Sequence, residues 1–172
     1  MIHFLDVTKD YDNQTALRNV TFSVEKGEMA FITGPSGSGK TTALKLIYLA
    51  EKPDEGTITV AGWETDQLRE SAVPFLRRNI GVVFQDFRLL ARKNVFENVA
   101  MALRIRGVGV LADEPTGNLD SDTAEGVMRI FRNVNTKGTT ILIATHNREL
   151  YRNSGRRVFR LDAGNLVGEE TR

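Results

Sequence analysis

The chain has 172 residues, of which 41% are hydrophobic and 26% are charged, and its formal net charge is +1. This composition predicts one globular domain over residues 1–172, and it argues against a strongly basic surface for nucleic acid. The sequence has no cysteine, which excludes disulfides, and no apolar run reaches the about 20 residues that cross a bilayer. We therefore expect no nucleic-acid partner, no secretory signal, and membrane contact only through another protein.

The first fifty residues predict three strands and a helix, in that order. Residues 2–7 and 20–24 are typical of two strands in one sheet, and residues 29–33 of a buried strand. Residues 41–50 form a largely apolar pattern that predicts a buried helix. A glycine-rich segment therefore lies between a strand and a helix.

This glycine-rich segment, residues 34–41, fits the phosphate-binding pattern G-x-x-x-x-G-K-[ST]. Glycines allow a tight loop whose N–H groups surround a polyphosphate, and the positive end of the following helix attracts the same anion. Lys40 would reach the β- and γ-phosphates, and the Thr41 hydroxyl would bind Mg²⁺. An ordinary turn before a helix is the alternative, but the flanking strand and helix favour a nucleotide site. The predicted nucleotide-binding residues of this segment are Gly34, Pro35, Ser36, Gly37, Ser38, Gly39, Lys40, Thr41 and Thr42.

The remainder of the chain continues to alternate strand and helix patterns, which predicts an α/β fold with a mainly parallel sheet and an antiparallel flank at the N-terminus. Either Asp120 or Ser121 could cap the helix that is expected to begin near residue 121. The apolar run before Asp113 is one residue short for a buried strand. The expected elements are strands at 57–61, 80–84, 111–113 and 139–145, helices at 95–106 and from 121 to about 134, and a closing hairpin of 157–161 with 165–167.

Polar residues end several of these strands, and ligands of parallel sheets gather at the carboxyl ends of strands. Asp113 could bind Mg²⁺ or its bound water, and Glu114 could accept a proton from an attacking water. An acidic pair after a strand is also a common surface feature. The phosphate-binding segment favours the functional interpretation.

Three further residues are candidates by position alone. Gln85 could contact the metal or orient water, His146 could contact the γ-phosphate, and the ring of Tyr11, in a polar loop after the first strand, could stack on adenine. Each also fits an ordinary structural role: a polar residue at a strand end, a surface histidine, or a packed aromatic ring.

Together these motifs resemble the ATP-binding subunits of ABC transporters. Residues 34–41, Gln85, Asp113 with Glu114, residues 118–120 and His146 follow the order of the Walker A, Q-loop, Walker B, D-loop and H-loop motifs. Residues 84–90 and 111–120 look most like the cell-division branch, although lipoprotein-release and macrolide-export ATPases share much of this pattern. The resemblance implies a P-loop NTPase of the ABC type that binds and hydrolyses ATP with Mg²⁺.

The resemblance also implies roles and partners. Thr41, Asp113 and Gln85 would serve the metal, and Glu114, His146 and Gln85 would be catalytic. Tyr11 would stack on the base, and Asp120 would lie at the seam of a homodimer that closes on ATP. An integral membrane partner would hold the subunit at the cytoplasmic face of the bacterial inner membrane. A nucleotide kinase or switch GTPase is disfavoured, because the sequence has no Asn-Lys-x-Asp motif and no arginine-rich lid.

One element of the family is absent. A helical subdomain ending in Leu-Ser-Gly-Gly-Gln/Glu should precede residue 111, yet no Ser-Gly-Gly occurs and the chain passes directly through residues 107–111. This pattern fits either an internal deletion or a mobile lobe that the numbering passes over. We favour the second, which predicts a Cα–Cα separation well beyond about 3.8 Å within 106–112. A chain that lacks the signature could instead be a nucleotide-gated binding module with little turnover.

Overall fold

The computed structural model describes all residues except 13, 85–93, 104–108 and 172. The first half of the chain contains β1 (Ile2–Tyr11), β2 (Gln14–Val24), β3 (Met29–Thr33), α1 (Lys40–Ile47), β4 (Glu55–Val60), β5 (Trp63–Glu64), η1 (Glu70–Ala72), α2 (Val73–Arg77) and β6 (Ile80–Val83). The second half contains α3 (Val95–Leu103), β7 (Gly109–Asp113), α4 (Ser121–Asn135), β8 (Thr140–Ala144), η2 (Arg148–Leu150), β9 (Arg157–Asp162) and β10 (Asn165–Thr171).

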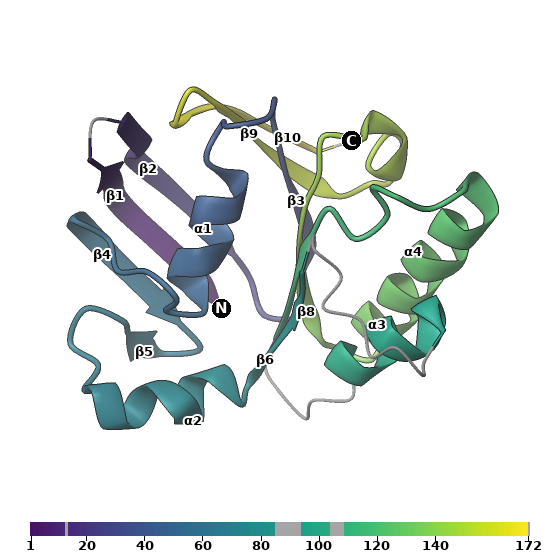
Figure 1. Cartoon of the computed structure of the whole chain (residues 1–172), viewed down its shortest axis with the longest axis horizontal. Coiled ribbons are helices and arrows are strands. Elements are labelled where there is room, and N and C mark those ends of the chain that lie inside the picture. The colour runs from purple at the N-terminus through teal and green to yellow at the C-terminus, as the bar shows by residue number, and fades with distance from the viewer. Residues whose placement is uncertain (13, 85–93, 104–108, 172) are drawn as a thin grey trace.

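A six-stranded sheet forms the centre of the molecule, in the order β10-β9-β3-β8-β7-β6. Its strands β9, β3, β8, β7 and β6 are parallel, and β10 pairs antiparallel with β9. Helix α1 covers one face, and α3 and α4 cover the other (Figure 1). Every residue of β3, β7 and β8 is buried, as expected for strands covered on both faces. The predicted mainly parallel sheet is confirmed.

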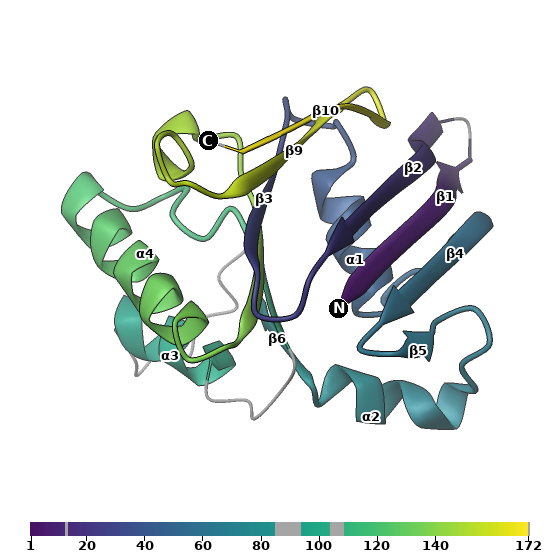
Figure 2. The ribbon, with the colours of Figure 1, turned by 180° about the vertical axis from the view of Figure 1, so that it is seen from behind.

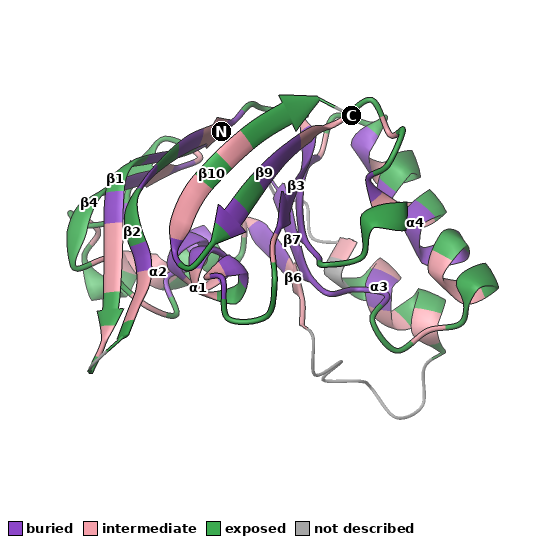
Figure 3. Cartoon of the chain, turned by 90° about the horizontal axis from the view of Figure 1, so that it is seen from above, coloured by how far each residue is buried: buried purple, intermediate pink, exposed green. Residues whose placement is uncertain are grey.

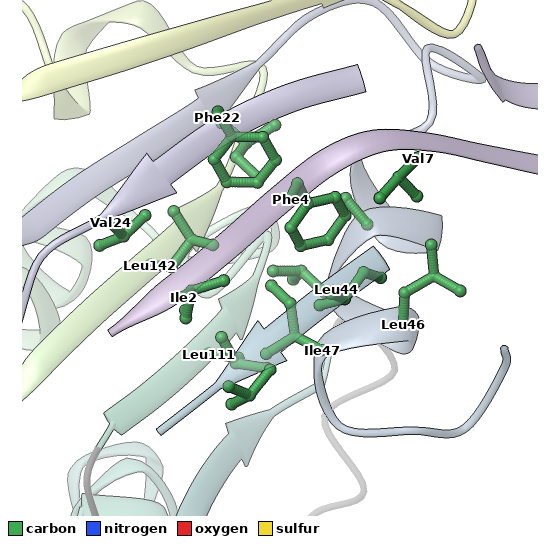
Figure 4. Packing of buried hydrophobic residues seen from close by; sticks show 14 of the residues in the cluster. Ile2, Phe4, Val7, Phe22, Val24, Leu44, Leu46, Ile47, Leu111 and Leu142 are labelled. Atoms are coloured by element: carbon green, nitrogen blue, oxygen red, sulfur yellow. The ribbon is translucent and has the colours of Figure 1, made fainter. Parts of the chain in front are cut away.

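A second, antiparallel sheet has the order β2-β1-β4-β5, and α1 lies between it and the central sheet (Figure 2). The larger apolar core fills this space (Figure 4). Phe4 of β1 and Phe22 of β2 stack with ring centroids 4.5 Å apart, and the cluster reaches Ile47 of α1 and Leu142 of β8. This packing confirms the predicted antiparallel flank.

Helix α4 packs against the other face of the central sheet through one buried stripe (Figure 3). Val127 and Phe131 are fully buried there with Phe31 of β3. Asp120 caps the helix, because its Oδ1 accepts hydrogen bonds from the backbone N–H groups of Asp122 and Thr123 at 3.1 and 2.9 Å. The cap is therefore Asp120 rather than Ser121.

The elements differ from the predictions mainly at their ends. The β1–β2 hairpin is longer than expected and places Tyr11 at the end of β1, opposite Gln14, not in a loop. Gly109 begins β7 opposite Thr140 and lengthens a strand whose apolar run is short. Helix α3 is described over Val95–Leu103, and residues 104–106 of the predicted helix lie outside the described residues. The proposed break within 106–112 falls largely outside the described residues. Of the helices in the described part of the chain, none is both long enough and apolar enough to span a membrane.

Candidate functional site

The glycine-rich loop joins β3 to α1, as predicted, and its glycines are required by close contacts. A Cβ atom at Gly34 would collide with the carbonyl oxygen of Leu161, and one at Gly39 would collide with that of Ala16. Gly39 also has a φ of 103°, which L side chains rarely adopt. Any side chain at these two positions would push the loop away from the strands that support it.

Lys40, the first residue of α1, is 7% exposed and turns back over the loop. Its Nζ donates hydrogen bonds to the carbonyl oxygens of Gly34 and Pro35 at 2.8 and 2.9 Å. Burial lowers the pKa of this ammonium group, while the charges of Glu114 and Asp113 act in the opposite direction. The lysine is therefore a buried cation, and the carboxylates of Glu114 and Asp113 are the opposite charges that act on it.

Asp113 ends β7 beside Thr41 and is the residue best suited to a metal ion. Burial raises the pKa of its carboxyl group, and a hydrogen bond with Thr41 opposes that shift. Its Oδ1 is buried and has no hydrogen-bond partner among the described residues. One hydroxyl and one free carboxylate oxygen fit Mg²⁺, which usually takes one or two protein ligands with water and phosphate oxygens. Within the described ranges, no group of three His, Asp or Glu side chains could form a metal cage.

Glu114 follows directly and is held by the end of β8. Its Oε1 accepts a hydrogen bond from the His146 backbone N–H at 2.9 Å and lies 2.7 Å from His146 Nδ1. Its Oε2 accepts from the Thr145 hydroxyl at 3.0 Å. The backbone φ of Glu114 is 45°, in the left-handed region. Because both carboxylate oxygens accept hydrogen bonds, the Glu114 side chain is held in one orientation. A strained backbone at such a residue is typical of functional sites.

One cavity of 510 Å³ brings these groups together with the end of the β1–β2 hairpin. Tyr11 lines it, with Lys9 Nζ 5.4 Å from the centre of its ring, and the buried Tyr11 hydroxyl has no partner in the described structure. Gln85 lies outside the described residues, although β6 ends at Val83 beside β7. The predicted residues that line this cavity are Tyr11, Pro35, Ser36, Gly37, Gly39, Lys40, Thr41, Thr42, Asp113, Glu114 and His146.

Sequence reasoning missed Thr145, although it directly precedes the predicted His146. It is fully buried, and besides its bond to Glu114 its hydroxyl accepts a hydrogen bond from the backbone N–H of Asn147 at 3.1 Å. A threonine that ends an apolar strand is the signal that could have identified it, because a buried hydroxyl needs a partner.

Comparison with known proteins places this geometry in a family. The family described as "ABC transporter" matches residues 17–154. The "Cell division ATP-binding protein FtsE" of Streptococcus pneumoniae D39 is 36% identical, and the match covers 100% of this chain and 96% of that protein. The protein of the same name from Escherichia coli K12 is 38% identical, with 98% of each chain covered.

Solved structures agree. A dimeric structure of "MJ0796, a Bacterial ABC Transporter Cassette" is similar with a TM-score of 0.85 and 29% identity, covering 99% of this chain and 98% of that one. The same cassette in a post-hydrolysis dimer bound to ADP and Pi also gives a TM-score of 0.85, at 28% identity.

The relatives are longer than this chain. The match to the pneumococcal protein runs over 221 positions, whereas this chain has 172 residues, so at least 49 positions of that relative have no counterpart here.

We expect Asp113→Asn to stabilise the nucleotide-free protein at neutral pH. Because burial raises the pKa of Asp113 in the folded state, its charge destabilises the fold at any pH above that raised value. The destabilisation decreases as the pH falls through that raised value and disappears below about 3.9, the ordinary Asp pKa, where the carboxyl group is neutral in both states. Thermal unfolding across this pH range measures the difference. A variant less stable than the parent at pH 7 would contradict the prediction.

Thr145→Val should lower the free energy of unfolding by about 1.5–3 kcal/mol, the usual contribution of a hydrogen bond to a charged group. Valine keeps the volume of threonine but removes the only donor to Glu114 Oε2 among the described residues. Urea unfolding provides the measurement, and Thr145→Ser, which keeps the hydroxyl, is the control. If serine is the more damaging substitution, packing of the methyl group rather than the hydrogen bond matters here.

Proposed function

Because the chain belongs to the ABC transporter family, as an ABC-type ATPase subunit, we propose that its 510 Å³ cavity binds ATP with Mg²⁺ and hydrolyses it. The observation that carries this proposal is the meeting of Lys40, Asp113 and Glu114 in that cavity. A buried cation lies on one side for the phosphates, and a free carboxylate oxygen and an oriented carboxylate lie on the other.

Each residue has a defined part in this reaction. Lys40 would leave the carbonyl oxygens of its own loop to bind the β- and γ-phosphates, and the loop N–H groups would surround them. Thr41 and Asp113 would hold Mg²⁺, which when bound neutralises charge on the phosphate oxygens. Gln85 would contact the metal and the attacking water.

Glu114 is the proposed general base. The water that attacks the γ-phosphate would give its proton to a Glu114 oxygen, and ADP and inorganic phosphate would form. Thr145 and the His146 backbone fix the direction of this carboxylate, so it need not be ordered during the reaction. The His146 side chain, 67% exposed beside Glu114, would contact the γ-phosphate.

The biological setting follows the relatives. Full-length relatives bear the name of the cell-division protein FtsE, so we propose that this subunit acts in cell division with an integral membrane partner of the FtsX type. ATP would close two copies into a homodimer, with Asp120 at the seam, at the cytoplasmic face of the inner membrane. The dimeric cassette structures support this arrangement. A lipoprotein-release or macrolide-export type of transporter is the alternative within the family.

A second candidate function is favoured by the shorter chain. We propose that the 49 or more missing positions belong to the helical signature subdomain near residues 107–111, since the sequence has no Ser-Gly-Gly. In the family, the signature of one subunit donates N–H groups to the γ-phosphate held by the other. Losing one such donor usually costs about 3–4 kcal/mol in the transition state, or roughly two to three orders of magnitude in rate. The chain would then be a nucleotide-gated module, and a steady-state ATPase assay with the membrane partner separates the two functions.

Lys40→Ala should weaken ATP binding by roughly 10- to 150-fold, because it removes charged hydrogen bonds worth about 1.5–3 kcal/mol. Titration with a fluorescent ATP analogue measures the loss. Lys26→Ala is the control, because Lys26 is exposed in the turn before β3 and does not line the cavity. If the parent and Lys40→Ala bind the analogue with equal affinity, the assignment of the phosphate site to this loop is wrong.

Glu114→Gln should leave ATP affinity nearly unchanged and reduce the hydrolysis rate by about 10²- to 10⁴-fold, the usual contribution of a general base. Single-turnover hydrolysis measures this step directly. Glu125→Gln on the exposed face of α4 is the control, because the Glu125 carboxylate forms an ion pair with Arg132 and does not line the cavity. Unchanged turnover in Glu114→Gln would reject the base assignment.

A further inference from the structure

A second cavity, of 350 Å³, adjoins the nucleotide cavity, and Pro35 and His146 line both. Its other walls include Arg148 from η2 and Arg160 from β9, two elements that follow the last predicted site residue in the chain. Neither arginine belongs to a motif that the nucleotide site uses. The cavity is therefore a separate feature that opens beside the glycine-rich loop.

Unpaired positive charge distinguishes this cavity. The side chains of Arg148 and Arg160 make no hydrogen bond or ion pair with the described part of the chain, whereas Arg157, on the same strand as Arg160, pairs with Glu28 and Glu169. Asp162 is the one carboxylate among the described lining residues, so two guanidinium groups leave an excess of one positive charge. Guanidinium groups bind phosphate with two parallel hydrogen bonds, which makes them the side chains best suited to this anion.

Hydroxyl groups add to this donor set. Thr33 and Tyr151 both line the cavity, and the Thr33 hydroxyl donates a hydrogen bond to the Tyr151 hydroxyl at 3.2 Å in a buried position. The Tyr151 oxygen accepts this bond and keeps its own hydrogen, for which the described structure shows no acceptor. The cavity therefore combines two free cations with a phenolic donor.

The position of the cavity points to the source of the anion. After hydrolysis, inorganic phosphate would lie between Lys40 and Glu114 while ADP still occupies the glycine-rich loop. The buried Glu114 carboxylate repels a phosphate anion, and His146, which lines both cavities, is mostly exposed. A phosphate that moves past Pro35 and His146 enters the cavity that contains the arginines.

We propose that Arg148 and Arg160 form a binding site for inorganic phosphate, and that this site receives the phosphate released from the nucleotide cavity. Its role in product release rests on the proposed ATPase function, but phosphate binding itself does not. Net positive charge beside the reaction site would draw the product away from Glu114 and so limit reversal of the reaction.

The experiment measures binding of radiolabelled inorganic phosphate to the full chain by equilibrium dialysis. The protein is first saturated with Mg²⁺ and a non-hydrolysable ATP analogue, so the γ-phosphate position is filled and only a second site can bind the probe. We expect saturable binding in the parent. The double variant Arg148→Gln with Arg160→Gln should bind phosphate at least about tenfold more weakly, since it loses both charge-assisted contacts.

Arg152→Gln with Arg156→Gln is the matched control. It removes the same charge from the segment between η2 and β9, but neither residue lines the cavity. We expect the control to bind phosphate within about twofold of the parent, because the charges it loses are screened by solvent. An equal loss in both double variants would overturn the proposal in favour of a general charge effect, and so would an absence of saturable binding in the parent.

Dimerisation and ATP hydrolysis are measured on the same variants. If the arginines instead bind a carboxylate of a second copy, the Arg148/Arg160 variant would lose analogue-induced dimerisation in sedimentation while phosphate binding stays unchanged, which would overturn the proposal. If the protein binds the analogue and phosphate but does not hydrolyse ATP, the proposed ATPase function fails while the phosphate site stands.

Discussion

The parallel pairing of β3, β8 and β7 is the constraint on which the site depends. Neighbouring parallel strands end at the same edge of a sheet, so the residues that follow them must meet there. The glycine-rich loop follows β3, His146 follows β8 and Asp113 ends β7. Two covered faces keep these strands in place, with α1 and the antiparallel sheet on one side and α3 and α4 on the other. The order of the strands in the sheet therefore brings the residues of the site together.

Burial leaves the charges of Lys40 and Asp113 poorly satisfied, and this has a functional meaning. Burial works against the charged forms of both Lys40 and Asp113, as the directions of their pKa shifts show. Lys40 is satisfied by carbonyl oxygens of its own loop, and Asp113 Oδ1 has no partner in the described structure. Phosphate oxygens would give Lys40 a stronger partner, and Mg²⁺ would do the same for Asp113. A bound metal–nucleotide complex should thus stabilise the fold, because compensation of the buried charges contributes to its affinity for the folded state.

Glu114 differs from its neighbour because both of its carboxylate oxygens accept hydrogen bonds from within the chain. Thr145 and His146 hold its carboxylate from β8, so the acid of one strand is oriented by the end of the next. His146 then links this acid to the second, arginine-lined cavity. Catalysis and product release would therefore share one side chain.

The sequence by itself determined the alternation of strands and helices, the glycine-rich loop and the identity of the residues that end β3, β7 and β8. These features are local: periodicity, turn residues and a short motif encode them within a few positions. Tertiary structure alone decided which strands are neighbours, and hence that Thr145, far from Glu114 in sequence, bonds to its carboxylate. It also decided that Tyr11 ends a long hairpin and that Gly109 completes β7, because pairing with Gln14 and Thr140 overrides weak local preference. The arginine cavity left no local signal either, since η2 and β9 become neighbours of the loop only when the sheet forms.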